Sequence, residues 1–208
     1  MTDLQRTDAW QDRRRGKFTG TSFADVMSQG RGNQPSVTRQ KCIKRIALER
    51  ITGRTKPTFQ SPAMLRGSEL EPFAAAAYEA EYGVILTQIE FADHPLLPHV
   101  GCSPDRILSE VKGVEIKCPE DEAHWQYLTT DQFLSDYKWQ MQGQMWVMGW
   151  EELDAVSFNP DWPAELQLAV RTVKRDQDLI DQLASEVEKA EAEVNQLINQ
   201  INEMRNAA

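Results

Sequence analysis

The sequence contains little cysteine and no long apolar run, and both features narrow the class of protein. The 208 residues include three cysteines, which are too few and too scattered for a disulfide framework or a four-cysteine metal site. Because no stretch of about eighteen apolar residues occurs, we expect no membrane span. The start, MTDLQRTDAWQDRRRGK, has no apolar segment behind its charges, so we expect no secretory signal. These absences favour a protein of the reducing cytoplasm.

Charge is unevenly distributed along the chain. The net charge of −9 argues by itself against a nucleic-acid-binding protein. Residues 1–66, however, hold 14 lysines and arginines and 5 acidic residues, whereas residues 67–208 hold 9 basic and 27 acidic residues. The first third of the chain is therefore strongly basic, which suits an anionic partner.

The first third is predicted to be mostly helical. Residues 37–52 place isoleucine and alanine at helical spacing before Gly53, a residue typical of helix ends. A second helix is predicted from Pro62 to the residue before Gly83. We expect its apolar face to consist of Met64, Leu65, Phe73, Ala77 and Tyr78.

The rest of the chain alternates between strand and helix patterns. Strands are predicted at 84–91, 104–109, 112–117, 154–160 and 166–173, with the second and third forming a hairpin. A long helix is predicted near 131–149. We expect an α/β fold, with a central mixed β-sheet flanked by helices.

The C-terminal stretch has apolar residues separated by alternating gaps of three and four, which predicts a long helix. These residues are Ile180, Leu183, Val187, Ala190, Val194, Leu197, Ile201 and Met204. The pattern fits a terminal helix packed on its own domain, and it also fits a self-association surface.

Two short predicted strands carry the residues with the clearest chemistry. Asp105 lies at the end of one strand, and Glu115 and Lys117 lie two apart on the next, so these two side chains share a face. Two carboxylates with carbonyl oxygens suit Mg²⁺ or Mn²⁺. A nearby lysine can orient or deprotonate a water, or neutralise charge on a phosphate. A solvated strand surface with a turn aspartate fits the same pattern.

Two further segments extend this candidate site. Glu71, in the middle of a predicted helix, can supply a third carboxylate, although an ordinary exposed glutamate fits equally well. Arg13–Arg15, followed by Gly20–Ser22 at a predicted helix start, form a candidate phosphate cradle of guanidinium, hydroxyl and backbone N–H groups. The alternative for this segment is a solvated basic turn.

The pattern P-D-x9-E-x-K resembles the PD-(D/E)XK nuclease signature. The words GCSPDRIL, GVEIKCP, RGSELEPFAAAAYE and KWQMQGQMWV resemble the bacteriophage lambda exonuclease, or YqaJ-like viral recombinase, family over roughly residues 8–150. The resemblance implies a restriction-endonuclease-like core and a single exonuclease domain over 1–208. Within it we expect a basic helical part at 1–66, a catalytic core at about 67–173 and a C-terminal helix at about 175–206.

The resemblance also implies roles for individual residues. Glu71, Asp105 and Glu115 would hold the metal, with the Ile116 carbonyl as a further ligand. Lys117 would be the catalytic lysine. The cofactor would be Mg²⁺, with Mn²⁺ as the alternative, at two ions per site.

Further roles concern the region around the scissile bond and the DNA end. Gln140 would steady the lysine or the scissile region. Arg14 would grip a terminal 5′-phosphate. Arg15 is a second candidate for this role, and the hydroxyl partner is open between Thr21 and Ser22.

The implied activity is 5′-to-3′ digestion of linear double-stranded DNA to mononucleotides, which leaves 3′ single-stranded overhangs for recombination. The implied partners are double-stranded DNA ends, two further copies in a homotrimeric ring, and a single-strand annealing recombinase. The implied location is the host cytoplasm, with the protein encoded by a phage or prophage. We expect much of the acidic C-terminal helix to face outward, away from the duplex.

Three alternatives remain. The first is a nuclease of another use: a PD-(D/E)XK endonuclease, or a CRISPR-associated exonuclease whose iron–sulfur cluster needs four cysteines. The second is a non-catalytic DNA-end-binding protein of the same fold. The third is an interaction module that acts through its heptad helix.

Overall fold

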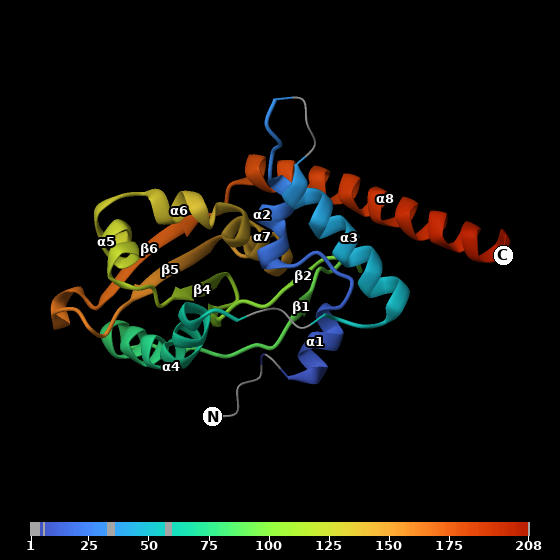
Figure 1. Cartoon of the computed structure of the whole chain (residues 1–208). Coiled ribbons are helices and arrows are strands. Elements are labelled where there is room, and N and C mark those ends of the chain that lie inside the picture. Colours follow the sequence, from blue (N-terminus) through green and yellow to red (C-terminus); the bar gives the residue numbers. More distant parts are fainter. Residues whose placement is uncertain (1–4, 6, 33–35, 57–59, 208) are drawn as a thin grey trace.

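The computed structural model describes residue 5 and residues 7–32, 36–56 and 60–207, and it confirms the expected α/β architecture (Figure 1). The helices and strands are α1 (Asp8–Arg14), α2 (Gly20–Met27), α3 (Val37–Thr52), α4 (Pro62–Tyr82), β1 (Ala92–Asp93), β2 (Gly101–Cys102), β3 (Arg106–Ser109), β4 (Lys112–Lys117), α5 (Asp121–Thr129), α6 (Gln132–Asp136), α7 (Lys138–Met148), β5 (Glu152–Phe158), the 3₁₀ turn η1 (Ala164–Leu166), β6 (Leu168–Lys174) and α8 (Gln177–Ala207). Within the described residues, no helix is both long and apolar enough to cross a membrane.

A four-stranded mixed sheet, in the order β3-β4-β5-β6, forms the centre of the fold. β4 and β5 are parallel, and the two outer pairs are antiparallel. The predicted hairpin is confirmed, with Arg106 opposite Val114. The strand predicted at 84–91 is wrong: there Thr87 alone bridges to Ile107, and regular pairing begins with β1. The β-branched composition of this segment had suggested more pairing than the edge of β3 offers.

Helices cover both faces of the sheet (Figure 1). α4 packs on the face that carries Val114 and Ile116, through Ala74, Ala75 and Tyr78. The apolar face predicted for α4 is wrong at Met64, Leu65 and Phe73, which are exposed. Because small alanines let a helix approach a sheet closely, they form the contact, and the larger side chains face solvent.

α5, α6 and α7 cover the opposite face of the sheet, and the helix predicted near 131–149 is in fact two helices. The break lies at Tyr137, whose backbone (φ −100°, ψ 8°) is outside the helical range. The Tyr137 ring packs against Phe133 and lies 4.7 Å from the Nζ of Lys117. The break therefore directs an aromatic ring toward the candidate site.

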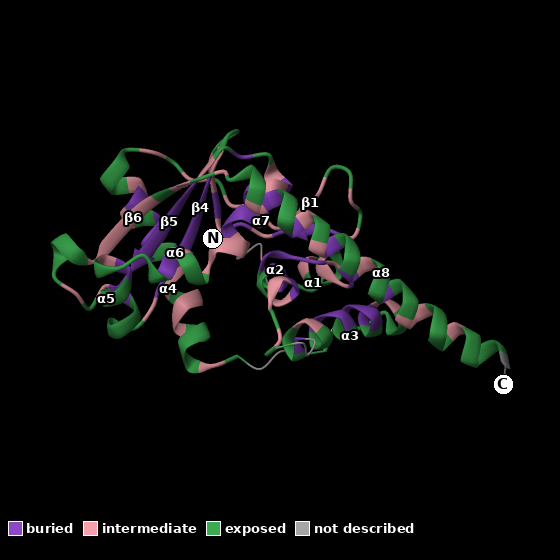
Figure 2. Cartoon of the chain, turned by 90° about the horizontal axis from the view of Figure 1, so that it is seen from above, coloured by how far each residue is buried: buried purple, intermediate pink, exposed green. Residues whose placement is uncertain are grey.

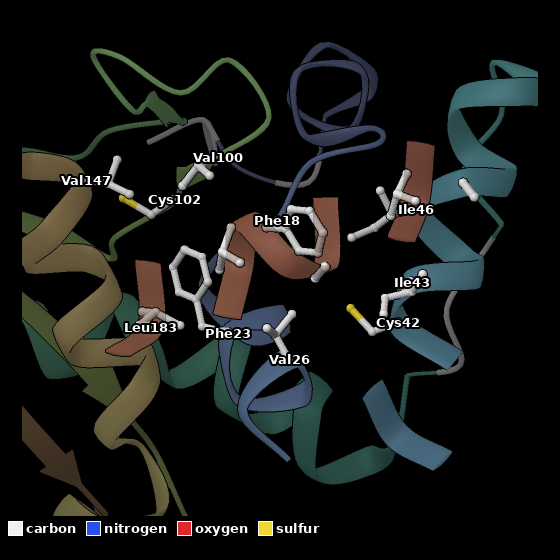
Figure 3. Packing of buried hydrophobic residues seen from close by; sticks show 14 residues of the cluster. Phe18, Phe23, Val26, Cys42, Ile43, Ile46, Val100, Cys102, Val147 and Leu183 are labelled. Carbon is white, nitrogen blue, oxygen red and sulfur yellow. The ribbon is translucent and has the colours of Figure 1, made fainter. Parts of the chain in front are cut away.

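A second layer, made of α2, α3 and α8, packs beside the sheet. Phe18, Phe23, Ile43, Ile46 and Leu183 belong to one common core, which spans from α7 to α3 (Figure 3). Five of the predicted heptad residues of α8, from Ile180 to Val194, are at most 1% exposed, whereas Ile201 and Met204 are exposed (Figure 2). Most of the apolar stripe of α8 thus packs on its own chain, and its last turns extend beyond it.

The acidic face of α8 is partly turned inward rather than outward as expected. Arg39 of α3 pairs with Glu186 and Glu193, and Arg50 pairs with Glu191. The basic first third and the acidic last helix therefore neutralise each other along one interface. The positive charges of α3 and the negative charges of α8 therefore pair with each other, which the sequence pattern did not reveal.

Candidate active site

Glu115 is the most enclosed carboxylate of the candidate site, at 1% exposed. As the strand alternation predicts, Glu115 and Lys117 share a face, and the Lys117 Nζ lies 2.6 Å from Glu115 Oε1. The amide of Gln140 donates to the same oxygen, and the amide of Gln144 donates to Oε2 at 2.6 Å. Both glutamines lie on α7, four residues apart and therefore on one helix face. Three donors from two elements thus fix the Glu115 carboxylate.

Asp105 precedes β3 and lies beside the end of β4. Its Oδ2 accepts a 2.7 Å hydrogen bond from the backbone N–H of Ile116. Continuing the register past Arg106 and Val114 would set Pro104 opposite Ile116. Because proline has no N–H, Pro104 cannot donate to the Ile116 carbonyl as a ladder partner would. The Ile116 N–H thus bonds the Asp105 carboxylate, and the Ile116 carbonyl receives no hydrogen bond from Pro104.

Glu71 is a half-buried residue of α4 rather than an exposed one, and it is held by Arg106. The Arg106 Nη1 donates to Glu71 Oε1 at 2.7 Å. Because α4 covers the Ile116 face, Glu71 and Glu115 approach Asp105 from opposite faces of β4. Among the described residues, no three histidine, cysteine, aspartate or glutamate side chains converge closely enough to hold a metal ion as they stand.

The electrostatics of this cluster follow from burial and from like charges. Burial raises the pKa of Asp105 well above its ordinary value, and the charges of Glu115 and Glu71 raise it further, while Lys117 opposes the shift. Burial lowers the pKa of Lys117, but Glu115 and Asp105 more than offset it, and the net pKa is raised. Lys117 is therefore a protonated donor at neutral pH, and the three carboxylates outnumber the two cations, Lys117 and Arg106, that pair with them.

The donor set fits a hard divalent cation in its chemistry. Asp105, Glu115 and Glu71 offer carboxylate oxygens, and the Ile116 carbonyl lies on the Asp105 side of β4. Oxygen donors of this kind suit Mg²⁺ and Mn²⁺. Because Arg106 and Lys117 now neutralise two of the carboxylates, a cation would have to compete with them. The excess negative charge that raises the Asp105 pKa is the charge a cation would offset.

Arg14 lies next to this cluster, at the end of α1. Its Nη1 donates to Ser103 Oγ at 2.9 Å and its Nη2 to Thr19 Oγ1 at 3.2 Å. The indole of Trp10 also donates to Ser103, and its ring lies 4.3 Å from the Arg14 guanidinium. Burial, together with the nearby charge of Arg45, lowers the pKa of Arg14 to about 10. A partly desolvated guanidinium suits an anion such as a phosphate, and Arg14 bonds Ser103, two residues before Asp105 in the chain.

The other residues expected to bind phosphate have different positions. Ser22 is 1% exposed, and its hydroxyl bonds the Thr19 backbone at the start of α2, so it caps the helix. Thr21 is exposed on the first turn of α2. Arg15 pairs with Asp12 and has no described contact with the Arg14 cluster. The structure brings together Arg14, Asp105, Glu115, Lys117 and Gln140, and it leaves Ser22 and Arg15 outside.

Sequence reasoning missed several residues of the site. Ser103 stands directly before the Pro-Asp pair, so its position in the motif was a usable signal. Gln144 follows Gln140 by one helical turn, which was a second signal. Arg106 stands directly after the Pro-Asp pair, so its position was a signal of the same kind as that of Ser103. Trp10 gave no comparable signal, because its partner Ser103 is distant in sequence.

Comparison with known proteins finds exonucleases of similar structure. The structure is similar to that of an alkaline exonuclease, LHK-Exo from Laribacter hongkongensis, with a TM-score of 0.89, 32% identity, 97% of this chain and 99% of that chain covered. It also has the fold of a phage-related exonuclease from Haemophilus somnus 129PT, with a TM-score of 0.74, 16% identity, 89% of this chain and 96% of that chain covered. No curated protein matches the sequence significantly. Residues 9–151 match the YqaJ-like viral recombinase domain, and the chain belongs to that family.

Proposed function

We propose that the protein is a metal-dependent exonuclease that digests linear double-stranded DNA from the 5′ end and leaves 3′ single-stranded overhangs. The observation that carries the proposal is the meeting of Asp105, Glu115 and Lys117 at the end of β4, beside Arg14. Membership of the family and the likeness to an alkaline exonuclease support a DNA exonuclease. LHK-Exo also has a structure in complex with dAMP, a mononucleotide of the kind that such a reaction releases.

Lys117 acts on the attacking water and the scissile phosphate. Because its pKa is raised, the ammonium group is protonated at neutral pH and donates hydrogen bonds. In this state it orients a water and offsets the negative charge that grows on the phosphate. Glu115 and the ring of Tyr137 hold the ammonium group in place. Gln140 and Gln144 in turn hold Glu115, so the lysine is positioned through its partner.

The cofactor in this proposal is Mg²⁺, with Mn²⁺ as the alternative, at two ions per site. When bound, the ions stabilise charge on the attacking and leaving oxygens. Asp105, Glu115 and the Ile116 carbonyl would hold them, and Glu71 would join once released from Arg106.

Arg14 has the end-binding role. Its guanidinium presents a charged, partly desolvated donor group between Ser103 and Thr19, and a terminal 5′-phosphate would compete for these donors. Thr21, exposed on the first turn of α2, is the remaining candidate hydroxyl.

The wider assembly is also part of the proposal. By resemblance to its family, the protein would form a homotrimeric ring on DNA and hand the 3′ strand to a single-strand annealing recombinase in the host cytoplasm. The exposed apolar residues Ile201 and Met204, near the end of α8, are available for a contact with another chain.

The deciding experiment is a time course on linear duplex DNA with one labelled 5′ end, with and without Mg²⁺. We expect label release as mononucleotide from the 5′ end, no reaction without metal, and no reaction on closed circular duplex. Lys117→Ala should abolish digestion and leave the protein folded. Cleavage of closed circles would instead identify an endonuclease, and binding of ends without any digestion would identify a non-catalytic end-binding protein.

A further inference from the structure

A tight turn sets the position of Arg14. The Lys17 N–H donates to the Arg14 carbonyl at 3.1 Å. The two central residues are Arg15 (φ −56°, ψ 126°) and Gly16 (φ +71°), which are the values of a type II turn. This turn requires a positive φ at its third residue, and glycine meets that requirement at no steric cost. Arg14 is thus the first residue of this turn, so the geometry of the turn sets the position from which the Arg14 side chain extends.

α3 holds both backbone polar groups of Gly16. The Gly16 N–H donates to Glu49 Oε2 at 2.8 Å, and the Gly16 carbonyl accepts from Arg50 Nε at 2.7 Å. Glu49 is 5% exposed, and its other oxygen accepts from Arg45. A Cβ added at Gly16 would lie 2.7 Å from the Arg50 Cγ, so the approach is close. Two adjacent side chains of α3 therefore clamp the turn.

The clamp extends to α8 through Arg50. Its Nη1 and Nη2 donate to the two oxygens of Glu191, each at 2.7 Å. Arg50 thus bonds the turn through Nε and bonds α8 through Nη1 and Nη2. A lysine cannot reproduce this arrangement, because its side chain carries a single nitrogen. Both side chains are largely buried, at 22% and 16% exposed, so water screens the pair weakly.

A neighbouring ion pair between the same two helices lacks this connection. Arg39 Nη1 lies 2.6 Å from Glu193 Oε1, and Glu193 is two residues beyond Glu191 on α8. The described contacts of Arg39 are with α8 and with the start of its own helix, and they do not include Gly16. The chain therefore supplies its own control for a merely structural α3–α8 ion pair.

We propose that Arg50 and Glu191 are positioning residues for end recognition: Glu191 of α8 holds Arg50, and Arg50 holds the Gly16 turn that places Arg14 against the DNA end. The inference rests on the proposed function, in which Arg14 binds the terminal 5′-phosphate. It gives the C-terminal helix a part in substrate choice, although α8 lies outside the family match over 9–151.

The test compares wild type with Arg50→Lys, Glu191→Ala and the control Glu193→Ala. Each protein digests the same linear duplex bearing either a 5′-phosphate or a 5′-hydroxyl, at substrate concentrations below saturation. The readout is the rate on the 5′-phosphate duplex divided by the rate on the 5′-hydroxyl duplex. Thermal unfolding of each variant reports its stability. We expect Glu193→Ala to lose little stability, because Glu193 is half-exposed and Arg39 keeps its pairing with Glu186. Glu191→Ala should lose more, because it leaves the largely buried Arg50 without its partner on α8.

The rate ratio separates the positioning role from a structural one. We expect it to fall roughly tenfold in Arg50→Lys and Glu191→Ala, short of the roughly hundredfold loss that a displacement of about 1 Å can cause. Glu193→Ala should keep the wild-type ratio. A wild-type ratio near one would overturn the end-binding role of Arg14 and this inference with it. A high ratio retained in both Arg50→Lys and Glu191→Ala, or lost equally in Glu193→Ala, would overturn the inference alone.

Discussion

Gln144 is a buried glutamine that binds Glu115 and that the sequence did not single out. Its Nε2 donates to Glu115 Oε2 at 2.6 Å, whereas its Oε1 is buried with no hydrogen-bond partner among the described residues. Gln142, on the same helix, is also buried, and its amide bonds the Lys174 carbonyl and the Asp176 N–H, both at 2.9 Å. The two glutamines are therefore matched in burial but differ in what they hold.

Replacing Gln144 by methionine should lower activity and spare stability. Methionine is unbranched and similar in size, so it can fill the space. A hydrogen bond to a charged group contributes about 1.5–3 kcal/mol, and removal of a buried unpaired oxygen returns about 1–3 kcal/mol. We therefore expect a change in the free energy of unfolding within about 1 kcal/mol. If the lost bond matters in the transition state, the digestion rate should fall about 10- to 150-fold.

The control, Gln142→Met, should have the opposite profile. It removes two satisfied hydrogen bonds, so we expect a loss of about 1–3 kcal/mol in the free energy of unfolding. The digestion rate per folded molecule should stay at the wild-type value, because Gln142 does not contact Glu115. Urea unfolding gives the stabilities, and digestion of a 5′-phosphorylated linear duplex at saturating Mg²⁺ gives the rates. A wild-type rate in Gln144→Met, or an equal loss in both variants, would refute the reasoning.

Two further predictions concern charge and packing. Because the pKa of Asp105 is raised on folding, its contribution to stability is full below its ordinary pKa and is lost as the pH rises through the raised value. Asp105→Asn should therefore raise the melting temperature of the metal-free protein at neutral pH and abolish digestion, and a lower melting temperature would contradict this. In α8, Val187→Ala should cost about 2 kcal/mol, because Val187 is fully buried, whereas Ile201→Ala at an exposed position should change the free energy of unfolding by less than about 0.5 kcal/mol. Urea unfolding measures the stability of the Val187→Ala and Ile201→Ala variants, and an equal loss in the two would contradict the burial pattern.

Local features of the fold could be predicted from the sequence because neighbouring residues determine them. Helix α3 ends just before Gly53 and α4 begins at Pro62, as their capping residues indicate. The hairpin of β3 and β4 follows from its composition, and the shared face of Glu115 and Lys117 follows from strand alternation. These relations depend on a few adjacent residues and on backbone geometry alone.

Features that depend on distant partners could not be predicted. The apolar side chains of α4 surround the helix, so only the sheet decided that Ala74 and Ala75 would be buried and Phe73 exposed. The break at Tyr137 lies within a continuous helical pattern, and the ring packing on Phe133 accompanies it. The acidic face of α8 gave no sign that it would pair with α3.

The sequence by itself determined the pattern of the candidate site: the Pro-Asp pair, Glu115 and Lys117 at fixed spacing, and the run of arginines at Arg13–Arg15. Tertiary structure decided how they meet. It set Glu71 and Glu115 on opposite faces of β4, enclosed Glu115 between two glutamines, and joined Glu191 to Arg50, 141 residues apart. The reason is physical: spacing fixes the direction of side chains within one element, whereas burial and charge pairing depend on which elements pack together.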